Sequence, residues 1–422
     1  MTHTILIIVV FILTLALILI RPRGLNEAWA TVAGGILMLI LRLESPGQAW
    51  QTVSQGSNVL LFLLGLLILS DLLRASGFFE WAAIHAARSA GGDGRALYRN
   101  VFLLGAVTTA FLSLDTTAVI LTPVVLSFVG RLKLTVRPFL LACAFVANTG
   151  SLLLPVSNLT NLLFVSAFHW SFGQFTLRMA LPQIAALLVN YWLFRRLFAN
   201  DLPDRFELDS LPKPKDVLRD GPYFYGAVTV LLLVLIGYFV GSLIHVQPYA
   251  IALTGCVVLL CWGIWRKQVG ISIVREISWP IFPFVIGLFV VVRGVESLGL
   301  AGLAARGLAT VGHSALAQDL GAAFGAGIGS NIVNNIPMAL LSISALRHGA
   351  SPAAQYGALL GCNLGPNLTV AGSLATMLVI TSARRHGEDV GARDFFGTGL
   401  RVTPLILLAA GLALWVSLKM LS

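Results

Sequence analysis

Long apolar runs separated by short polar connections make up most of this chain. Several runs reach the ~20 residues that an α-helix needs to cross the ~30 Å hydrocarbon core of a bilayer. In the first half, the pattern predicts spans at about 5–20, 25–41, 57–74, a broken 138–168, and 175–198. In the second half, it predicts spans at 223–243, 247–265, 279–297, a broken 354–382, and 396–420. The pattern therefore indicates an all-α membrane protein with ten transmembrane helices.

Two further apolar stretches, 97–130 and 316–347, are too long for one crossing. At ~1.5 Å per residue the first would reach roughly 50 Å. Each carries a polar interruption, at Asp115 in the first stretch and at Asn334 and Asn335 in the second. We interpret both as re-entrant hairpins, whose tips must be buried in protein or face water.

The two halves of the chain share landmarks. The matching pairs are Gly65 and Gly287, Gly77 and Gly299, Pro123 and Pro337, Asn148 and Asn363, and Gly150 and Gly365. Each half crosses the membrane five times, because its hairpin does not cross. Five is an odd number, so the second half must be upside down relative to the first. This is the inverted-repeat plan of secondary transporters, in which matching breaks mark the binding site. The predicted units are a first repeat at 1–198, a linker at 199–222 and a second repeat at 223–422.

Composition and charge agree with a membrane location. Of 422 residues, 57% are hydrophobic and 11% are charged, which excludes an ordinary soluble protein. The net charge of +10 does not indicate a nucleic-acid partner, because the basic residues lie in short connections and not on one soluble face. Most of them fall on one predicted side, which the positive-inside rule makes cytoplasmic. Both termini are then predicted on the outer side, the linker is cytoplasmic, and the hairpins enter from opposite sides.

Asp115 is the acid that we place deep in the membrane outside a regular helix. Acids at such depth are rare and often serve as proton relays or ion ligands. A structural alternative is a helix cap at the start of the second hairpin arm. We predict that Asp115 couples transport to protons. The other tip carries amides, so only one tip can titrate.

Polar side chains gather where Gly150, Pro155 and Gly365 should break the helices and expose backbone groups to a cavity. Small polar side chains also pack membrane helices together, and this alternative stays open. The predicted substrate-binding residues are Asn148, Ser157, Asn158, Asn334, Asn335, Asn363, Thr369 and Ser373.

Other chemistry finds little support in the sequence. The four cysteines lack metal-type spacing; Cys362 is a candidate soft ligand, although a lone buried cysteine is usually a small apolar group. No G-x-x-x-x-G-K-[ST] motif occurs, so any ATP drive must come from another subunit. No nucleophile constellation appears. We expect a transporter and not an enzyme, with no cofactor and no resident metal.

Several motifs resemble the bacterial arsenical pump membrane protein family (ArsB), within the ion transporter superfamily. They are Gly77-Phe-Phe-Glu80-Trp81, Ile120-Leu-Thr-Pro123, Val156-Ser-Asn158-Leu-Thr-Asn161, Asn334-Asn335-Ile-Pro337 and Gly361-Cys-Asn363-Leu-Gly365-Pro366. The resemblance covers essentially the whole chain. It implies elevator-like efflux of arsenite and antimonite across the bacterial inner (cell) membrane, where the orientation from the positive-inside rule makes both termini periplasmic. Efflux would be driven by proton antiport or by a partner ATPase on the cytoplasmic side. Relatives can carry Asp at the positions of Asn148 and Asn363. The residues that couple transport to protons in those relatives are therefore not assigned to this chain by position alone.

The chemistry of the implied substrate suits these residues. Arsenite near neutral pH is an uncharged trihydroxide, which amides, hydroxyls and half-helix ends can bind without a buried counter-charge. No Lys or Arg falls in the polar pieces, which counts against a dicarboxylate. Two alternatives stay open. One is a cation (Na⁺)/proton antiporter of the same architecture, and the other is a passive subunit that docks an ATPase through 199–222.

Overall fold

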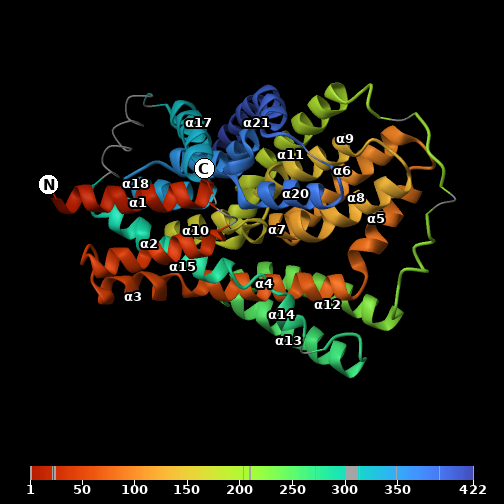
Figure 1. The fold of residues 1–422 in the computed structure, drawn as a ribbon, viewed down its shortest axis with the longest axis horizontal. Helices are drawn as coiled ribbons and strands as arrows, with labels where there is room; N and C mark the ends of the chain where they lie inside the picture. Colours follow the sequence, from red (N-terminus) through yellow and green to blue (C-terminus); the bar gives the residue numbers. More distant parts are fainter. Residues whose placement is uncertain are drawn as a thin grey trace.

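The computed structural model describes residues 2–20, 22, 25–202, 204–208, 211–270, 272–299, 312, 314–347, 349–388 and 390–421. These residues form helices and connections, with one isolated bridge between Asp93 and Arg205 and no strand within the described ranges (Figure 1).

The described helices fall into the two halves of the chain. Those of the first half are α1 (Thr2–Ile20), α2 (Glu27–Ile40), α3 (Pro46–Gln55), α4 (Ser57–Ala75), α5 (Phe78–Arg88), α6 (Gly94–Phe111), α7 (Leu114–Thr116), α8 (Thr122–Arg131), α9 (Val136–Thr149), α10 (Leu159–Phe168) and α11 (Phe172–Leu197). Those of the second half are α12 (Gly221–Leu243), α13 (Pro248–Trp265), α14 (Ile273–Glu276), α15 (Ile281–Glu296), α17 (Ala315–Val333), α18 (Asn335–Leu346), α19 (Pro352–Leu364), α20 (Leu374–Arg385) and α21 (Ala392–Met420).

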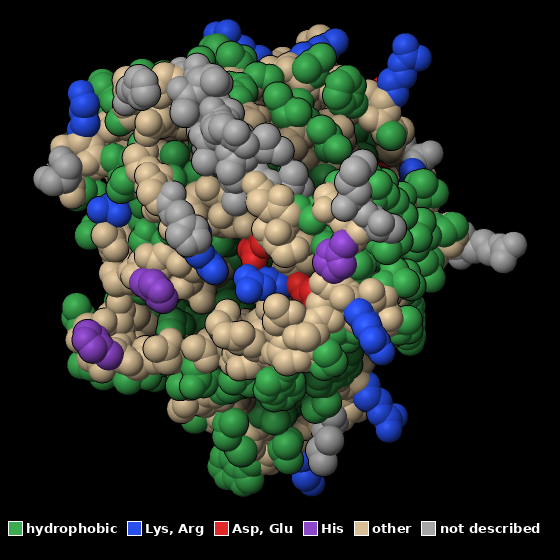
Figure 2. All heavy atoms as spheres, turned by 90° about the vertical axis from the view of Figure 1, so that its left-hand side faces the viewer, with side chains coloured by type: hydrophobic (Ala, Val, Ile, Leu, Met, Phe, Trp, Pro, Cys, Tyr) green, Lys and Arg blue, Asp and Glu red, His purple; other side chains and the backbone are tan. Residues whose placement is uncertain are grey.

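The helices show the character of a multi-pass membrane protein. Within the described ranges, six are long and apolar enough to cross a bilayer: Ser57–Ala75, Leu114–Arg131, Phe172–Leu197, Gly221–Leu243, Pro248–Trp265 and Ala392–Met420. Large apolar side chains such as Leu233, Leu188 and Val257 are exposed on them. Figure 2 shows hydrophobic side chains over much of the outline of one face, with most Lys and Arg side chains at its edge and acidic side chains in a central hollow. A lipid environment accounts for the large apolar side chains exposed on these helices.

Two helix pairs each join one helix of the first half to one helix of the second half: α2 packs against α15, and α4 packs against α13. A Cβ added to Gly287 would lie 2.5 Å from the backbone carbon of Thr31, and one added to Gly65 would lie 2.8 Å from the Cβ of Ala252. Both glycines therefore allow the close backbone approach that small residues provide in membrane helix pairs. This shared role gives a physical reason for the match between Gly65 and Gly287.

The two stretches predicted as hairpins approach the middle of the molecule from opposite ends. In Figure 1, α6 and α8 lie toward the right, α17 and α18 lie toward the left, and α7 lies between them. Ser113 caps the first tip by accepting a hydrogen bond from the backbone N–H of Thr116 at 3.1 Å. Asn334 caps the second tip with φ of +75°. The structural alternative for Asp115, a helix cap, is therefore wrong, because Ser113 fills that position.

The second arms of the hairpins are built differently. Pro337 lies in the first turn of α18, directly after the tip. Pro123 follows the π-helical turn Thr117–Leu121, well beyond the first tip. The first hairpin therefore has an additional segment before its proline. Asp115 belongs to this segment, which has no counterpart in the second hairpin.

Both predicted broken helices are interrupted where Gly and Pro indicate. After Thr149, the first continues as two short 3₁₀ turns, Gly150–Leu152 and Pro155–Ser157, before α10. The second does the same through Gly365–Leu368 and Val370–Gly372 before α20. Asn158 and Ser373 cap the restarted helices through their side chains. The helical runs are thus interrupted by 3₁₀ turns at corresponding places in the two halves.

Candidate functional site

The two broken helices are joined side chain to side chain where they are interrupted. The Nδ2 of Asn158 donates to the Oδ1 of Asn363 at 2.7 Å, and the Nδ2 of Asn363 donates to the Oδ1 of Asn161 at 2.6 Å. The hydroxyl of Thr160 also donates to Asn363. Asn363 therefore connects the second half to three residues of the first half. All four side chains are buried, where unpaired amides would be costly.

A second set of contacts lies beside this one. The Nδ2 of Asn148 donates to the Oδ1 of Asn367 at 2.9 Å and to the hydroxyl of Thr376 at 3.0 Å. The Nδ2 of Asn367 donates to the hydroxyl of Thr149 at 3.0 Å. The Oδ1 of Asn148 is buried and has no hydrogen-bond partner among the described residues. We call Asn148, Asn158, Asn161, Asn363 and Asn367 the amide cluster.

The other predicted polar residues tie the hairpins to the broken helices. The hydroxyl of Ser157 donates to the carbonyl oxygen of Ala110 at 2.6 Å, which attaches the first hairpin. The hydroxyl of Thr369 donates to the Oδ1 of Asn331 at 2.8 Å, and the Nδ2 of Asn334 donates to the carbonyl of Ala371 at 3.1 Å.

Two predicted residues remain at the helix starts. Ser373 caps α20 and lies 2.9 Å from the hydroxyl of Thr376. The Oδ1 of Asn335 is buried without a partner in the described part of the chain. These contacts join each hairpin and its broken helix into one packed body.

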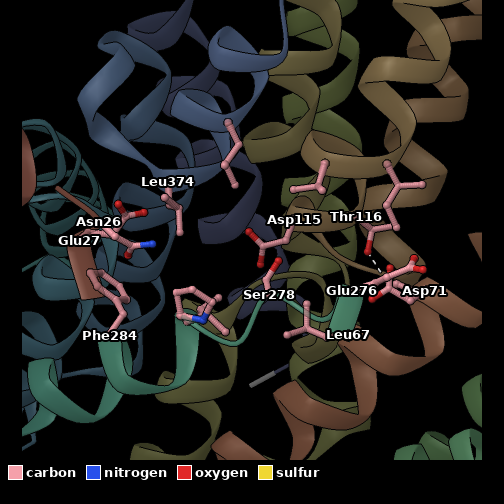
Figure 3. A pocket seen from close by; sticks show the side chains of 16 residues that line it. Asn26, Glu27, Leu67, Asp71, Asp115, Thr116, Glu276, Ser278, Phe284 and Leu374 are labelled. Carbon is pink, nitrogen blue, oxygen red and sulfur yellow. Dashed lines mark hydrogen bonds between the residues drawn. The ribbon is translucent and has the colours of Figure 1, made fainter. Parts of the chain in front are cut away.

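A cavity of about 210 Å³ lies beside this body, and Asp115 lines it. Its walls come from the start of α2, the middle of α4, the first hairpin, the connection before α15, and α20. The lining residues are Asn26, Glu27, Leu67, Ser70, Asp71, Asp115, Thr116, Val119, Ile120, Glu276, Ser278, Pro280, Ile281, Phe284, Leu374 and Leu378. Figure 3 shows Asp115 close to Ser278, with Asp71 and Glu276 on one side and Asn26 and Glu27 on the other.

The polar groups of this cavity differ in their pairing. Arg74 bonds Asp71 at 3.1 Å and also bonds Glu276, so both of these carboxylates have a cationic partner. The hydroxyls of Ser70 and Thr116 lie 2.9 Å apart. Asp115 is partly buried and makes no hydrogen bond or ion pair with another described residue. Asp115 is therefore the carboxyl here that is left available to a proton or a ligand.

The predicted site residues do not all lie at the cavity. Asp115 lines it, whereas the eight predicted substrate-binding residues are absent from its lining. The nearest link is Ser373, since the next residue, Leu374, is part of the wall. In this conformation the side chains of the amide cluster hydrogen-bond one another outside the lining of the cavity. Cys362 is fully buried in α19, with the hydroxyl of Ser342 at 4.0 Å from its sulfur, and it does not line the cavity either.

Sequence reasoning missed three groups. Glu276 and Ser278 come from a connection that gave no signal of proximity to the first hairpin. Asp319 is fully buried in α17, and neither carboxylate oxygen has a hydrogen-bond partner among the described residues. A Cβ on Gly357 would lie 2.9 Å from its Oδ1, so its carboxyl packs closely against α19. An acid within the Ala- and Gly-rich stretch Ala315–Val333 is the signal that could have found it.

Comparison with known proteins gives a consistent picture. A sequence model described as the arsenical pump membrane protein (ArsB) matches residues 6–418. The arsenical pump membrane protein of Escherichia coli K12 is 31% identical over 420 residues, which covers 97% of this chain and 98% of that protein. The protein of that name in Yersinia enterocolitica is 32% identical over 427 residues, with 97% and 99% covered. The crystal structure of the Alcanivorax borkumensis YdaH transporter matches with a TM-score of 0.58 and 15% identity, covering 99% of this chain and 98% of that one. This last likeness concerns the fold.

Proposed function

The chain belongs to the arsenical pump membrane protein family, and on that premise we propose that it exports arsenite and antimonite in exchange for protons. The observation that carries the proposal is the Asp115 cavity. Among the described residues, hydroxyls, an amide and carboxyls line it, and no Lys or Arg does. An anion such as arsenate or a dicarboxylate would meet unfavourable electrostatics there. A neutral trihydroxide would meet hydrogen-bonding groups and a carboxyl able to carry a proton.

We propose that the amide cluster and the cavity belong to one transport pathway. The amide Oδ1 atoms of Asn148 and Asn335 are buried without partners in the described chain, so both can accept a hydrogen bond from a substrate hydroxyl. Movement of α20, which carries Ser373 and borders the cavity through Leu374, would expose these amides. The substrate would then bind among the eight predicted polar residues, with Asp115 exchanging the proton.

The way in which the helices divide supports an elevator-like mechanism. Leu67, Asp71 and Phe284 bring α4 and α15 to one side of the cavity, and Asp115 and Leu374 bring the hairpin and broken-helix body to the other. A cavity between two such bodies changes shape when one slides past the other. The matched glycine contacts and the opposed hairpins support two inverted repeats, and the basic connections place both termini in the periplasm.

A resistance test checks the proposed substrate. Expression of this chain in a bacterial strain lacking arsenite exporters should restore growth on arsenite and antimonite and lower cell-associated arsenic. It should give no protection against arsenate when arsenate reduction is absent, because the cavity disfavours anions. Sodium-dependent proton release from vesicles without any arsenite effect would contradict the proposal and favour a cation/proton antiporter.

We further propose that the linker is the docking surface for a partner ATPase. Arg88 bonds the carbonyl oxygens of Leu211 and Pro212 at 2.9 and 3.0 Å, which holds the linker against α5. The side chains of Lys213 and Lys215 remain exposed beside this contact.

Charge reversal tests this docking surface. Lys213→Glu with Lys215→Glu should remove the extra resistance that a co-expressed arsenical pump ATPase supplies, while the resistance given by the chain alone stays unchanged. Lys267→Glu is the control, because Lys267 is exposed on another connection. Loss of all transport in the double variant would instead indicate a passive subunit, and an unchanged ATPase effect would place the docking surface elsewhere.

A further inference from the structure

Two groups of three charged residues occupy matching places at opposite ends of the packed pairs α2–α15 and α4–α13. The first consists of Asp71 and Arg74 on α4 with Glu276 of α14, and it borders the Asp115 cavity. Arg74 bridges its two acids, which come from different halves of the chain. This group therefore ties α4 to the connection that precedes α15.

The second group consists of Arg293 and Glu296 on α15 with Glu44. The ion pair between Arg293 and Glu296 measures 3.1 Å and has the same one-turn spacing as the pair between Asp71 and Arg74. Aligning Gly65 with Gly287 places Arg293 at the position of Asp71 and Glu296 at that of Arg74, so the order of the charges is reversed. Glu44 lies in the turn between α2 and α3, in the connection that precedes α4. The third residue of each group, Glu276 or Glu44, thus comes from the equivalent connection of the other half.

Glu44 differs from its counterpart Glu276 in being buried and incompletely paired. Its residue is 6% exposed, and its Oε2 has no hydrogen-bond partner among the described residues. Its backbone N–H donates to the carbonyl of Met38 at 3.3 Å, which holds the turn against an apolar cluster that includes Leu43 and Val295. A buried carboxylate without full pairing is strongly disfavoured, so this site favours the protonated acid.

The turn that carries Glu44 joins α2 to α3, at the left-hand end of the molecule in Figure 1. Figure 2 views the molecule from that side and shows a hollow near the middle of the face, with acidic and basic side chains next to one another inside it. Solvent-borne ions can therefore reach charged groups at this end. The Asp115 cavity is bordered by the other group of charges.

We propose that Glu44, together with Arg293 and Glu296, is a proton-binding site at the end of the protein opposite the group of Asp71, Arg74 and Glu276. This inference rests on the proposed proton exchange for its role in transport. Glu44 would take up the proton on that side before Asp115 exchanges it, and Arg293 would pair with Glu44 once the proton has left. The ligand is the proton alone, because one buried carboxyl does not supply the several oxygen ligands of a metal ion.

The charges around Glu44 agree with this role. Burial raises the pKa of Glu44 to about 7, while the charge of Arg293 lowers this pKa and that of Glu296 raises it. Of the other elements near this turn, α1 contributes only His3, whereas α3 and α18 carry no titratable side chain, and the preceding Arg42 is exposed. The acid therefore passes from mainly protonated to mainly ionised as the pH rises through about 7.

Infrared difference spectroscopy of the purified full chain in lipid tests the site without arsenite or a gradient. The wild type should show a protonated-carboxyl band that disappears as the pH rises through about 7. Glu44→Gln should remove the Glu44 component of this band and leave any component from Asp115 or Asp319. Glu207→Gln, an exposed change in the linker, should leave the whole band unchanged. Arg293→Gln should move the midpoint to higher pH and Glu296→Gln to lower pH. These opposite shifts test the site even where Glu44→Gln folds poorly.

Two results would overturn the proposal: a wild-type spectrum from which Glu44→Gln removes no titrating component, or a midpoint of that component that neither neighbouring change moves. Because the readout is a titration, it is independent of substrate identity. Glu44 titrating normally in a protein that does not exchange arsenite for protons would reject the proposed function and leave the proton site standing. In the working transporter, Glu44→Gln should also remove the change of export rate with external pH around 7.

Discussion

Asp115→Asn is expected to reduce proton-driven arsenite uptake into everted membrane vesicles to background while leaving a folded, membrane-inserted protein. The substitution keeps the shape of the side chain but removes its titratable proton. Asp115 is the cavity carboxyl without a described partner, whereas Asp71 and Glu276 share Arg74 and Ser113 already caps the hairpin tip. Loss of the titratable group should therefore affect coupling far more than folding.

The controls separate chemistry from structure. Asp115→Glu keeps a carboxyl and should retain part of the proton-driven uptake. Asp201→Asn changes an exposed acid in the linker and should behave as wild type. Uptake should be measured together with the vesicle proton gradient, using a pH-sensitive dye. Undiminished uptake by Asp115→Asn would move coupling to another acid, and the buried Asp319 is then the next one to test.

Asn363→Ala should lower thermal stability markedly and abolish transport. Its side chain accepts hydrogen bonds from Asn158 and Thr160 and donates one to Asn161. Truncation leaves these three buried groups without that partner, and each unsatisfied group costs about 1–3 kcal/mol. The effect should appear as a lower unfolding temperature of the purified protein in lipid or detergent, followed by Trp fluorescence.

Two companion variants sharpen this measurement. Asn200→Ala removes an exposed amide and should leave both stability and transport unchanged. Asn363→Asp retains the acceptor for Asn158 and loses the donor to Asn161, so its stability should lie between those of the wild type and Asn363→Ala. A wild-type unfolding temperature for Asn363→Ala would show that the amide cluster does not hold the two halves together.

Local chemistry explains why parts of the architecture could be predicted from sequence. Gly150 and Pro155 interrupt a helix wherever the chain places them, so the break after Thr149 was predictable. Gly65 and Gly287 could be matched because both sit at close helix contacts. Asp115 attracted attention because an acid in an apolar stretch is costly, and it does line the cavity.

What the sequence could not predict depends on contacts between distant segments. The hydrogen bond between Asn158 and Asn363 joins residues in different halves of the chain. The local sequence pattern therefore could not show that these amides bond each other instead of lining the cavity. Ser278 reaches Asp115 only because its connection folds over the first hairpin. Asp319 lies in a regular helix and lacked the Gly or Pro interruption that marked the other sites.

The most direct test of the central claim uses the purified chain in sealed liposomes with no other protein. An imposed proton gradient, acidic inside, should drive arsenite into the liposomes against its own gradient, and addition of arsenite should release protons from them. A protonophore should abolish both movements. Arsenite that only equilibrates across the membrane, with no accumulation and no arsenite-dependent proton movement, would contradict proton exchange through the Asp115 cavity.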